Sequence, residues 1–210
     1  MTTNDALTKC LQRLASTRAP LRHIDLCWRH IGIKGAKALA GALERGPFPA
    51  LQVIELLGNR FGNEGAAALA GALERGSFPM LQSIDLGCNN IRDAGATALA
   101  RSLERGSFPM LETIGLDGNS IGDEGAKALA QALERGWFPA LGVIGLRGTN
   151  IGHETRDKVS RGIAAMHRRI RLLAFLGAEL DRAPITAAKR FLTRDGDHAA
   201  LWRVLKFMKF

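Results

Sequence analysis

Apolar and polar residues recur along the chain with a period of thirty residues, beginning at Leu21. Each block opens with a short alternation in which Ile and Leu stand two residues apart, as in Ile54 and Leu56. Side chains two apart point to the same face of a strand, so each block predicts a short strand with one buried face. In three blocks an asparagine follows, at Asn59, Asn89 and Asn119. We expect these amides to bond the backbone of neighbouring turns.

The second half of each block has helical spacing. Leucines four residues apart, such as Leu69 and Leu73, form one stripe among alanines that are small enough for helices to pack side by side. Short polar residues stand where they would cap the helix start, at Asn63, Asp93 and Asp123. Glycines stand where a left-handed C-cap would end the helix, at Gly46, Gly76, Gly106 and Gly136. The Glu-Arg pairs before these glycines predict exposed ion pairs between neighbouring helices.

Five such blocks follow one another without insertion between residues 21 and 170. They share the line L-x-x-I-x-L-x-x-N-x-I-G-x-E-G-A-x-A-L-A-x-A-L-E-R-G-x-F-P-x. This line resembles the leucine-rich repeat of the ribonuclease-inhibitor-like type, which is also found in NOD-like receptors. The resemblance implies an α/β solenoid, a curved horseshoe with parallel strands on the concave face and helices on the convex face. Such scaffolds bind many different partners, so the resemblance implies binding without naming a partner.

The repeat pattern divides the chain into three parts. Residues 6–20 echo the helical half of a repeat, so residues 1–20 are predicted to form an N-terminal helical cap. Residues 21–170 are the five repeats, the last of them degenerate, and residues 171–210 predict a basic helical cap or extension. The net charge of +9 is concentrated near this end, because residues 154–210 hold 13 lysines and arginines against six acidic residues.

The cysteine content and the first residues bear on the compartment. Three cysteines, Cys10, Cys27 and Cys88, are an odd and sparse set, which favours a reducing compartment over a disulfide framework. The N-terminal residues lack the basic and apolar regions of a signal peptide, and no run of 18 apolar residues occurs. We therefore expect a cytoplasmic protein.

The outward-facing strand positions are the first candidate site, because near-identical repeats differ there. They form three columns: His23, Val53, Ser83, Thr113 and Val143; then Asp25, Glu55, Asp85, Gly115 and Gly145; then Cys27, Leu57, Gly87, Asp117 and Arg147. The row formed by Asp25, Glu55 and Asp85 is either a receiver of basic partner groups or a solvated ladder of like charges. The predicted partner-binding residues are His23, Asp25, Trp28, Glu55, Leu57, Ser83, Asp85, Thr113, Asp117 and Arg147.

Trp28 stands where later repeats have glycine or cysteine. It is either a binding anchor or part of the packing of the N-terminal cap, and we favour the cap.

The basic C-terminal part offers an alternative surface. Its predicted contacts are Arg168, Arg169, Arg171, Lys189, Arg190, Arg203 and Lys206, interleaved with aromatic residues. These cations could bind nucleic acid or an anionic membrane surface, or take part in self-association as a homodimer. Alternatively, the aromatic residues pack on the last repeat and the cations are solvated.

No catalytic motif, cofactor loop or metal module is found in the sequence. His23, Cys27 and His30 suggest a metal by residue type only, since their spacing matches no common zinc module. Residues 117–124 resemble a calcium loop but place Ile121 where an oxygen ligand is needed. We expect no enzyme, cofactor or metal, and predict a scaffold that binds a protein partner on the concave strand face.

Overall fold

The computed structural model describes residues 20–46, 48–136 and 138–180. Its elements alternate strictly between strand and helix. They are β1 (His23–Asp25), α2 (Gly32–Arg45), β2 (Val53–Glu55), α3 (Gly62–Arg75), β3 (Ser83–Asp85), α4 (Asp93–Arg105), β4 (Thr113–Gly115), α5 (Asp123–Arg135), β5 (Val143–Gly145) and α6 (His153–Leu180). The predicted thirty-residue unit of one strand and one helix is therefore confirmed.

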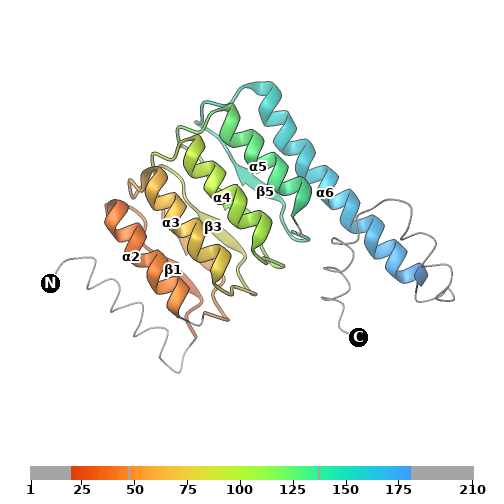
Figure 1. Ribbon diagram of the computed structural model, residues 1–210, viewed down its shortest axis with the longest axis horizontal. Coiled ribbons are helices and arrows are strands. Elements are labelled where there is room, and N and C mark those ends of the chain that lie inside the picture. The colour runs from red at the N-terminus through yellow and green to blue at the C-terminus, as the bar shows by residue number, and fades with distance from the viewer. Residues whose placement is uncertain (1–19, 47, 137, 181–210) are drawn as a thin grey trace. The chain divides into compact units, whose positions relative to one another are not determined.

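The five strands form one parallel sheet in the order β1-β2-β3-β4-β5. Each strand pairs with the next at an offset of one repeat, so Ile24 lies beside Ile54, and Ile54 beside Ile84. The helices lie side by side in a layer that covers one face of the sheet (Figure 1). This alternation of parallel strands and helices in a single open sheet confirms the predicted solenoid fold.

The core lies between the sheet and the helices and repeats with the sequence. The central isoleucine of the first four strands is buried, as are the leucines of α2 to α5. One phenylalanine per repeat, from Phe48 to Phe138, closes the core beyond the helix end. Because the strand and helix of one repeat bury only part of their apolar surface, each repeat depends on its neighbours.

A ladder of buried asparagines joins three repeats. Asn59 and Asn89 are fully buried, and Asn119 is 2% exposed. The Asn89 amide donates to the carbonyl oxygens of Leu56 and Gly87 at 2.8 and 2.9 Å, and its Oδ1 accepts from the N–H of Asn59 at 2.9 Å. The expected bonds between neighbouring turns are confirmed, and they satisfy backbone groups that would otherwise be buried unpaired.

The glycines after the helices end them as predicted, but the predicted left-handed conformation is wrong. Gly46 and Gly106 are extended, with φ of −96° and −76°. Glycine is needed there for space, since a Cβ on Gly46 would lie 2.6 Å from the Phe48 ring. The bulky residue that closes the core thus excludes a side chain at the helix end.

The predicted capping residues cap a different helix from the one expected. Asn63, Asp93 and Asp123 lie within α3, α4 and α5 and are not their N-cap residues, which make no side-chain cap bond. Instead, Oδ1 of Asp93 accepts from the N–H groups of Gly122 and Gly125 at 2.7 and 2.9 Å, at the start of α5. Each cap therefore ties one repeat to the next.

The last helix differs from the others in length. α6 has 28 residues, whereas α2 to α5 have 13 or 14, and it continues past residue 170. Compactness divides the chain into two units, Met1–Met166 and His167–Phe210. Of the predicted caps, residues 1–19 and 181–210 lie outside the described residues. In the part that is described, no helix is long and apolar enough to cross a membrane.

Candidate functional site

The side of the sheet that faces away from the helices is called the strand face here. In the first four strands the central residue is buried and its two neighbours are more exposed. Successive side chains of a strand point to opposite sides, so these neighbours belong to the strand face. The pairing register places Asp25 beside Glu55 and Glu55 beside Asp85, which confirms the predicted acidic row.

The aspartates of the strand face are held by backbone hydrogen bonds. Oδ1 of Asp25 accepts from the N–H of Cys27 at 3.0 Å, and Oδ1 of Asp85 accepts from the N–H of Gly87 at 2.8 Å. Asp117 accepts from the N–H of Arg147 in the next repeat. The bond from Cys27 lowers the pKa of Asp25, so this carboxyl group stays ionised well below neutral pH.

His23 and Glu55 form a cross-strand pair on the same face. His23 Nε2 lies 2.9 Å from Oε2 of Glu55, and both side chains are substantially exposed. Glu55 therefore has a neighbour that can donate a hydrogen bond.

Two glycines make room for carboxylates of the preceding repeat. A Cβ on Gly115 would lie 2.6 Å from Oδ1 of Asp85, and a Cβ on Gly145 would clash with the carboxylate of Asp117. Both carboxylates thus lie against the bare backbone of the next strand. A glycine in a strand often marks such a close approach.

Trp28 lies at the β1 end of the strand face. It is 59% exposed, and its backbone N–H donates to the carbonyl oxygen of Leu57 at 2.8 Å. Its ring covers Gly58, where a Cβ would lie 2.3 Å from ring atoms. The ring is held against the next repeat and still presents much of its surface to solvent.

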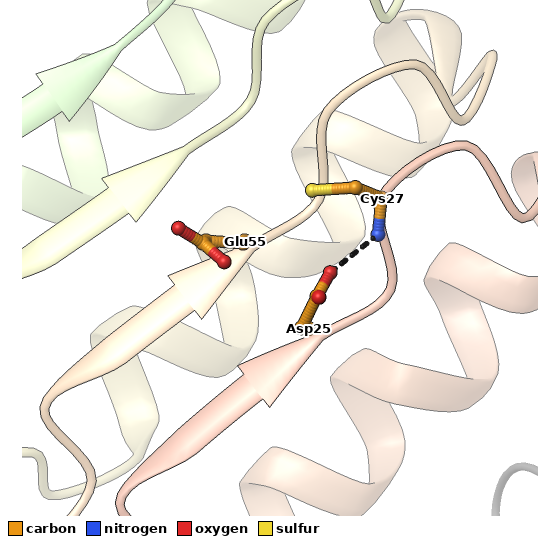
Figure 2. A group of neighbouring side chains, drawn as sticks. All are labelled: Asp25, Cys27 and Glu55. Atoms are coloured by element: carbon orange, nitrogen blue, oxygen red, sulfur yellow. Dashed lines mark hydrogen bonds between the residues drawn. The ribbon is translucent and has the colours of Figure 1, made fainter.

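Asp25, Cys27 and Glu55 gather between β1 and β2 (Figure 2). One possible ligand atom from each lies within 4.8 Å of the others. Burial raises the pKa of the Cys27 thiol, which disfavours the thiolate that binds metals. Within the described residues this grouping joins Cys27 to two carboxylates and does not include His23 or His30. The donor set therefore does not support the zinc-like combination considered from residue type.

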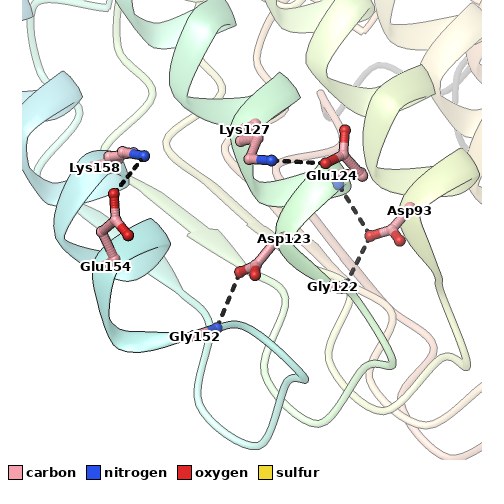
Figure 3. Close-up of polar contacts among 9 residues, drawn as sticks. Asp93, Gly122, Asp123, Glu124, Lys127, Gly152, Glu154 and Lys158 are labelled. Carbon is pink, nitrogen blue, oxygen red and sulfur yellow. Dashed lines mark hydrogen bonds and ion pairs between the residues drawn. The ribbon is translucent and has the colours of Figure 1, made fainter.

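The carboxylates of the helical side are paired with cations. Figure 3 shows Glu124 with Lys127 and Glu154 with Lys158 at the loop edge beside the caps of Asp93 and Asp123. Further pairs join successive repeats: Lys37–Glu64 at 2.8 Å, Glu44–Arg75 at 2.7 Å, Glu74–Arg105 at 3.2 Å and Glu104–Arg135 at 3.5 Å. The expected ion pairs between neighbouring helices are confirmed.

The alternative basic surface lies largely beyond the described residues. Arg168 is exposed on α6, and Arg169 and Arg171 belong to the same helix. The other predicted contacts, Lys189, Arg190, Arg203 and Lys206, lie outside the described residues.

Sequence reasoning missed the contacts that orient these side chains. At the end of β1, the carboxylate of Asp25 accepts from the backbone N–H of Cys27, two residues further along the chain. This two-residue spacing is a recognisable sequence signal. The seating of Trp28 on Gly58 has no local signal, since it depends on how two repeats stack.

The single open sheet of parallel strands with helices on one face matches a leucine-rich-repeat solenoid fold. A family model described as "Leucine Rich repeat" matches residues 50–70, 79–100 and 109–130. No curated protein matches the sequence.

Many solved structures are similar to this chain, and two of them are described by their titles. One is titled "Leiomodin-1 Actin-Binding Site 2 (ABS2)", with 16% identity, a TM-score of 0.61, and coverage of 86% of this chain and 99% of that one. The other is a tropomodulin C-terminal domain from Caenorhabditis elegans, with 17% identity, a TM-score of 0.61, and coverage of 84% and 99%. At this identity the likeness extends to the fold alone.

Proposed function

We propose that the chain is a non-enzymatic scaffold that binds a protein partner through the strand face. The observation that carries the proposal is where the repeats differ. The central strand column is isoleucine in all five repeats, whereas the column beside it contains His, Val, Ser, Thr and Val. Packing explains the constant column, and a specific partner explains the variable one.

The proposed contacts extend over the whole sheet. They are His23, Asp25, Trp28, Glu55, Leu57, Ser83, Asp85, Thr113, Asp117 and Arg147. All of them are exposed or partly exposed. A partner that covers five strands at roughly 4.8 Å spacing would span about 20 Å, which suits a folded domain or a long segment.

Three finer assignments belong to the same proposal. The repeat motif L-x-x-I-x-L-x-x-N-x-I-G-x-E-G, with a full helix in each unit, supports the ribonuclease-inhibitor-like type of leucine-rich repeat, although a thirty-residue unit is slightly longer than is usual for it. Residues 1–20 and 171–210 are proposed as caps of the repeat region, because the apolar ends of a solenoid need cover. A cytoplasmic location rests on the sparse cysteines.

The test is affinity capture from lysate with three forms of the full chain. One variant adds two arginines on the strand face, Ser83→Arg with Thr113→Arg. Its matched control adds two arginines at exposed helical positions, Ala67→Arg with Gln131→Arg. We expect a partner of the wild type to be lost by the first variant and retained by the second. Retention by both would refute the strand face as the binding site.

Purified actin is a sensible defined bait in the same experiment, because one structural relative has actin binding in its title. The alternative function, binding of nucleic acid or anionic membrane through the basic end, is tested with glutamine at Arg168, Lys189, Arg190, Arg203 and Lys206. If only that variant loses binding of nucleic acid or anionic membrane, the basic C-terminal part, and not the strand face, is the binding site.

A further inference from the structure

Acidic residues on the two sides of the repeats differ in how their charge is compensated. On the helical side, Glu44, Glu64 and Glu124 each have a lysine or arginine within 2.8 Å. On the strand face, Asp25, Asp85 and Asp117 form no ion pair with a lysine or arginine in the part of the chain that the structure describes. The same repeats thus pair carboxylates of the helical side with lysine or arginine and leave three carboxylates of the strand face without such an ion pair among the described residues.

The uncompensated carboxylates are held in a regular arrangement. Asp25 and Asp85 belong to one column of the sheet, with Glu55 between them. Neighbouring members are roughly 4.8 Å apart along the row. Backbone N–H groups fix Asp25 and Asp85, so the carboxylates do not need to be ordered when a ligand arrives.

The local charge opposes the charge of the whole chain. The chain has a net charge of +9, yet four carboxylates occupy the strand face. The described cations near these carboxylates are His23, which already contacts Glu55, Arg29, whose charge assists the hydrogen bond from Cys27 in lowering the pKa of Asp25, and Arg147, whose backbone N–H donates to Asp117. Within the described residues, these three stand against four carboxylates, and none of the three forms an ion pair with Asp25, Asp85 or Asp117. An anionic partner such as nucleic acid would be repelled here, whereas a cationic group would find complementary charge.

An aromatic ring stands at one end of the acidic row. Trp28 follows Cys27, whose sulfur lies within 4.8 Å of carboxylate oxygens of Asp25 and Glu55. The exposed indole ring is held over Gly58. A guanidinium group stacks favourably on such a ring while it pairs with nearby carboxylates.

We propose that the strand face docks a lysine- and arginine-rich segment of a protein partner. Asp25, Glu55, Asp85 and Asp117 receive its cationic side chains, and Trp28 receives an arginine. The inference rests on the proposed function and specifies the chemistry of the partner. The occupant is a polypeptide, because the carboxylates extend across four repeats and a single ion would engage only one part of the row.

The test uses a fluorescent peptide of about twelve residues that alternates arginine and alanine, with a glutamate-alanine peptide as the negative probe. The strand-face variant combines Asp25→Asn, Asp85→Asn and Asp117→Asn. Asparagine keeps the oxygen that accepts the backbone N–H, so the fold is preserved. The matched control combines Glu64→Gln, Glu124→Gln and Glu154→Gln on the helical side. Both variants raise the net charge by three.

At low salt we expect the arginine peptide to bind the wild type and the glutamate peptide not to bind. The strand-face variant should weaken binding by about tenfold or more, and the helical-side control by less than about twofold. Trp28→Ala should weaken binding of the arginine peptide by about threefold to tenfold. A peptide with lysine in place of arginine should lose less affinity, so the preference for arginine over lysine should be smaller than in the wild type. Equal weakening in both triple variants, or no binding by the wild type, would overturn the inference.

These outcomes are separate from those for the proposed function. If the Ser83 and Thr113 arginine variant loses a partner while the cationic peptide fails to bind, the strand face is a binding site for a partner of other chemistry. If neither the partner nor the peptide depends on this face, both proposals fail.

Discussion

Single residues of this protein act mainly through contacts with a neighbouring repeat. Asn89 bonds the backbone of the preceding turn, and Trp28 lies on a glycine thirty residues further along. Because these contacts join equivalent positions, the loss of one residue weakens an interface between two repeats. Residue-scale changes should therefore lower the stability of the stack more than the stability of one helix.

Asn89→Ala should lower the free energy of unfolding by about 2–4 kcal/mol, because it leaves buried backbone groups unpaired. Asn150→Ala is the control, since Asn150 is exposed, and it should cost less than about 0.5 kcal/mol. Urea unfolding followed by circular dichroism measures both. Equal losses would show that the ladder contributes no more than a surface amide.

Gly46→Ala should destabilise by about 1–3 kcal/mol through overpacking against Phe48. Because the cause is steric, Phe48→Leu should relieve part of the overpacking. The double variant should then lose less free energy of unfolding than the sum of the losses in the two single variants. Unfolding of all four forms in urea gives the coupling energy. Additive losses would instead point to a conformational requirement for glycine.

At the scale of elements, helices α4, α5 and α6 are capped by side chains of the preceding repeat. Oδ1 of Asp93 accepts from the N–H of Gly122, just before α5, and from that of Gly125 within it, and Oδ1 of Asp123 accepts from the N–H of Gly152, just before α6. The hydroxyl of Thr155 and the N–H of Gly152 lower the pKa of Asp123, which keeps this cap ionised. The hydrogen bonds that cap these helices also join successive repeats. The cap of such a helix therefore forms only when the preceding repeat is folded beside it.

Asp93→Ala should destabilise the protein by about 0.5–2 kcal/mol, the usual range for the loss of a helix cap. Asp93→Asn should cost less, because the acceptor oxygen is kept. Glu124→Ala is the control, since its exposed ion pair with Lys127 should contribute less than about 1 kcal/mol. Thermal and urea unfolding compare the three. A cost for Asp93→Ala no larger than for the control would contradict the role of the inter-repeat cap.

At the scale of the whole molecule, charge is arranged by face. Ion pairs on the helical side lower the pKa values of Glu44, Glu64 and Glu154, with Arg75, Lys37 and Lys158 as the respective partners. On the strand face, Glu55 contacts His23, and Asp25, Asp85 and Asp117 accept backbone hydrogen bonds but form no ion pair with a lysine or arginine among the described residues. A chain with a net charge of +9 therefore carries four carboxylates on one face of its sheet.

Stability should fall on acidification. The affected carboxyl groups have folded pKa values below their ordinary values of 3.8 for aspartate and 4.5 for glutamate. Their contribution is complete above those values and is lost as the pH falls through the folded pKa values. The melting temperature should be nearly constant above about pH 5 and decline towards about pH 2. Asp123→Asn should decline less steeply than the wild type, and an identical profile would contradict the assigned role of this cap.

The sequence by itself determined the repeat length, the order of strand and helix, the buried columns and the acidic row. These follow from local periodicity and side-chain volume, which each thirty-residue block carries in full. Tertiary structure alone decided that Asn63, Asp93 and Asp123 cap the following helix, that the helix-ending glycines are extended, and that Trp28 lies on Gly58. Each of these depends on the distance between equivalent atoms of stacked repeats, a quantity set by packing that no single block encodes.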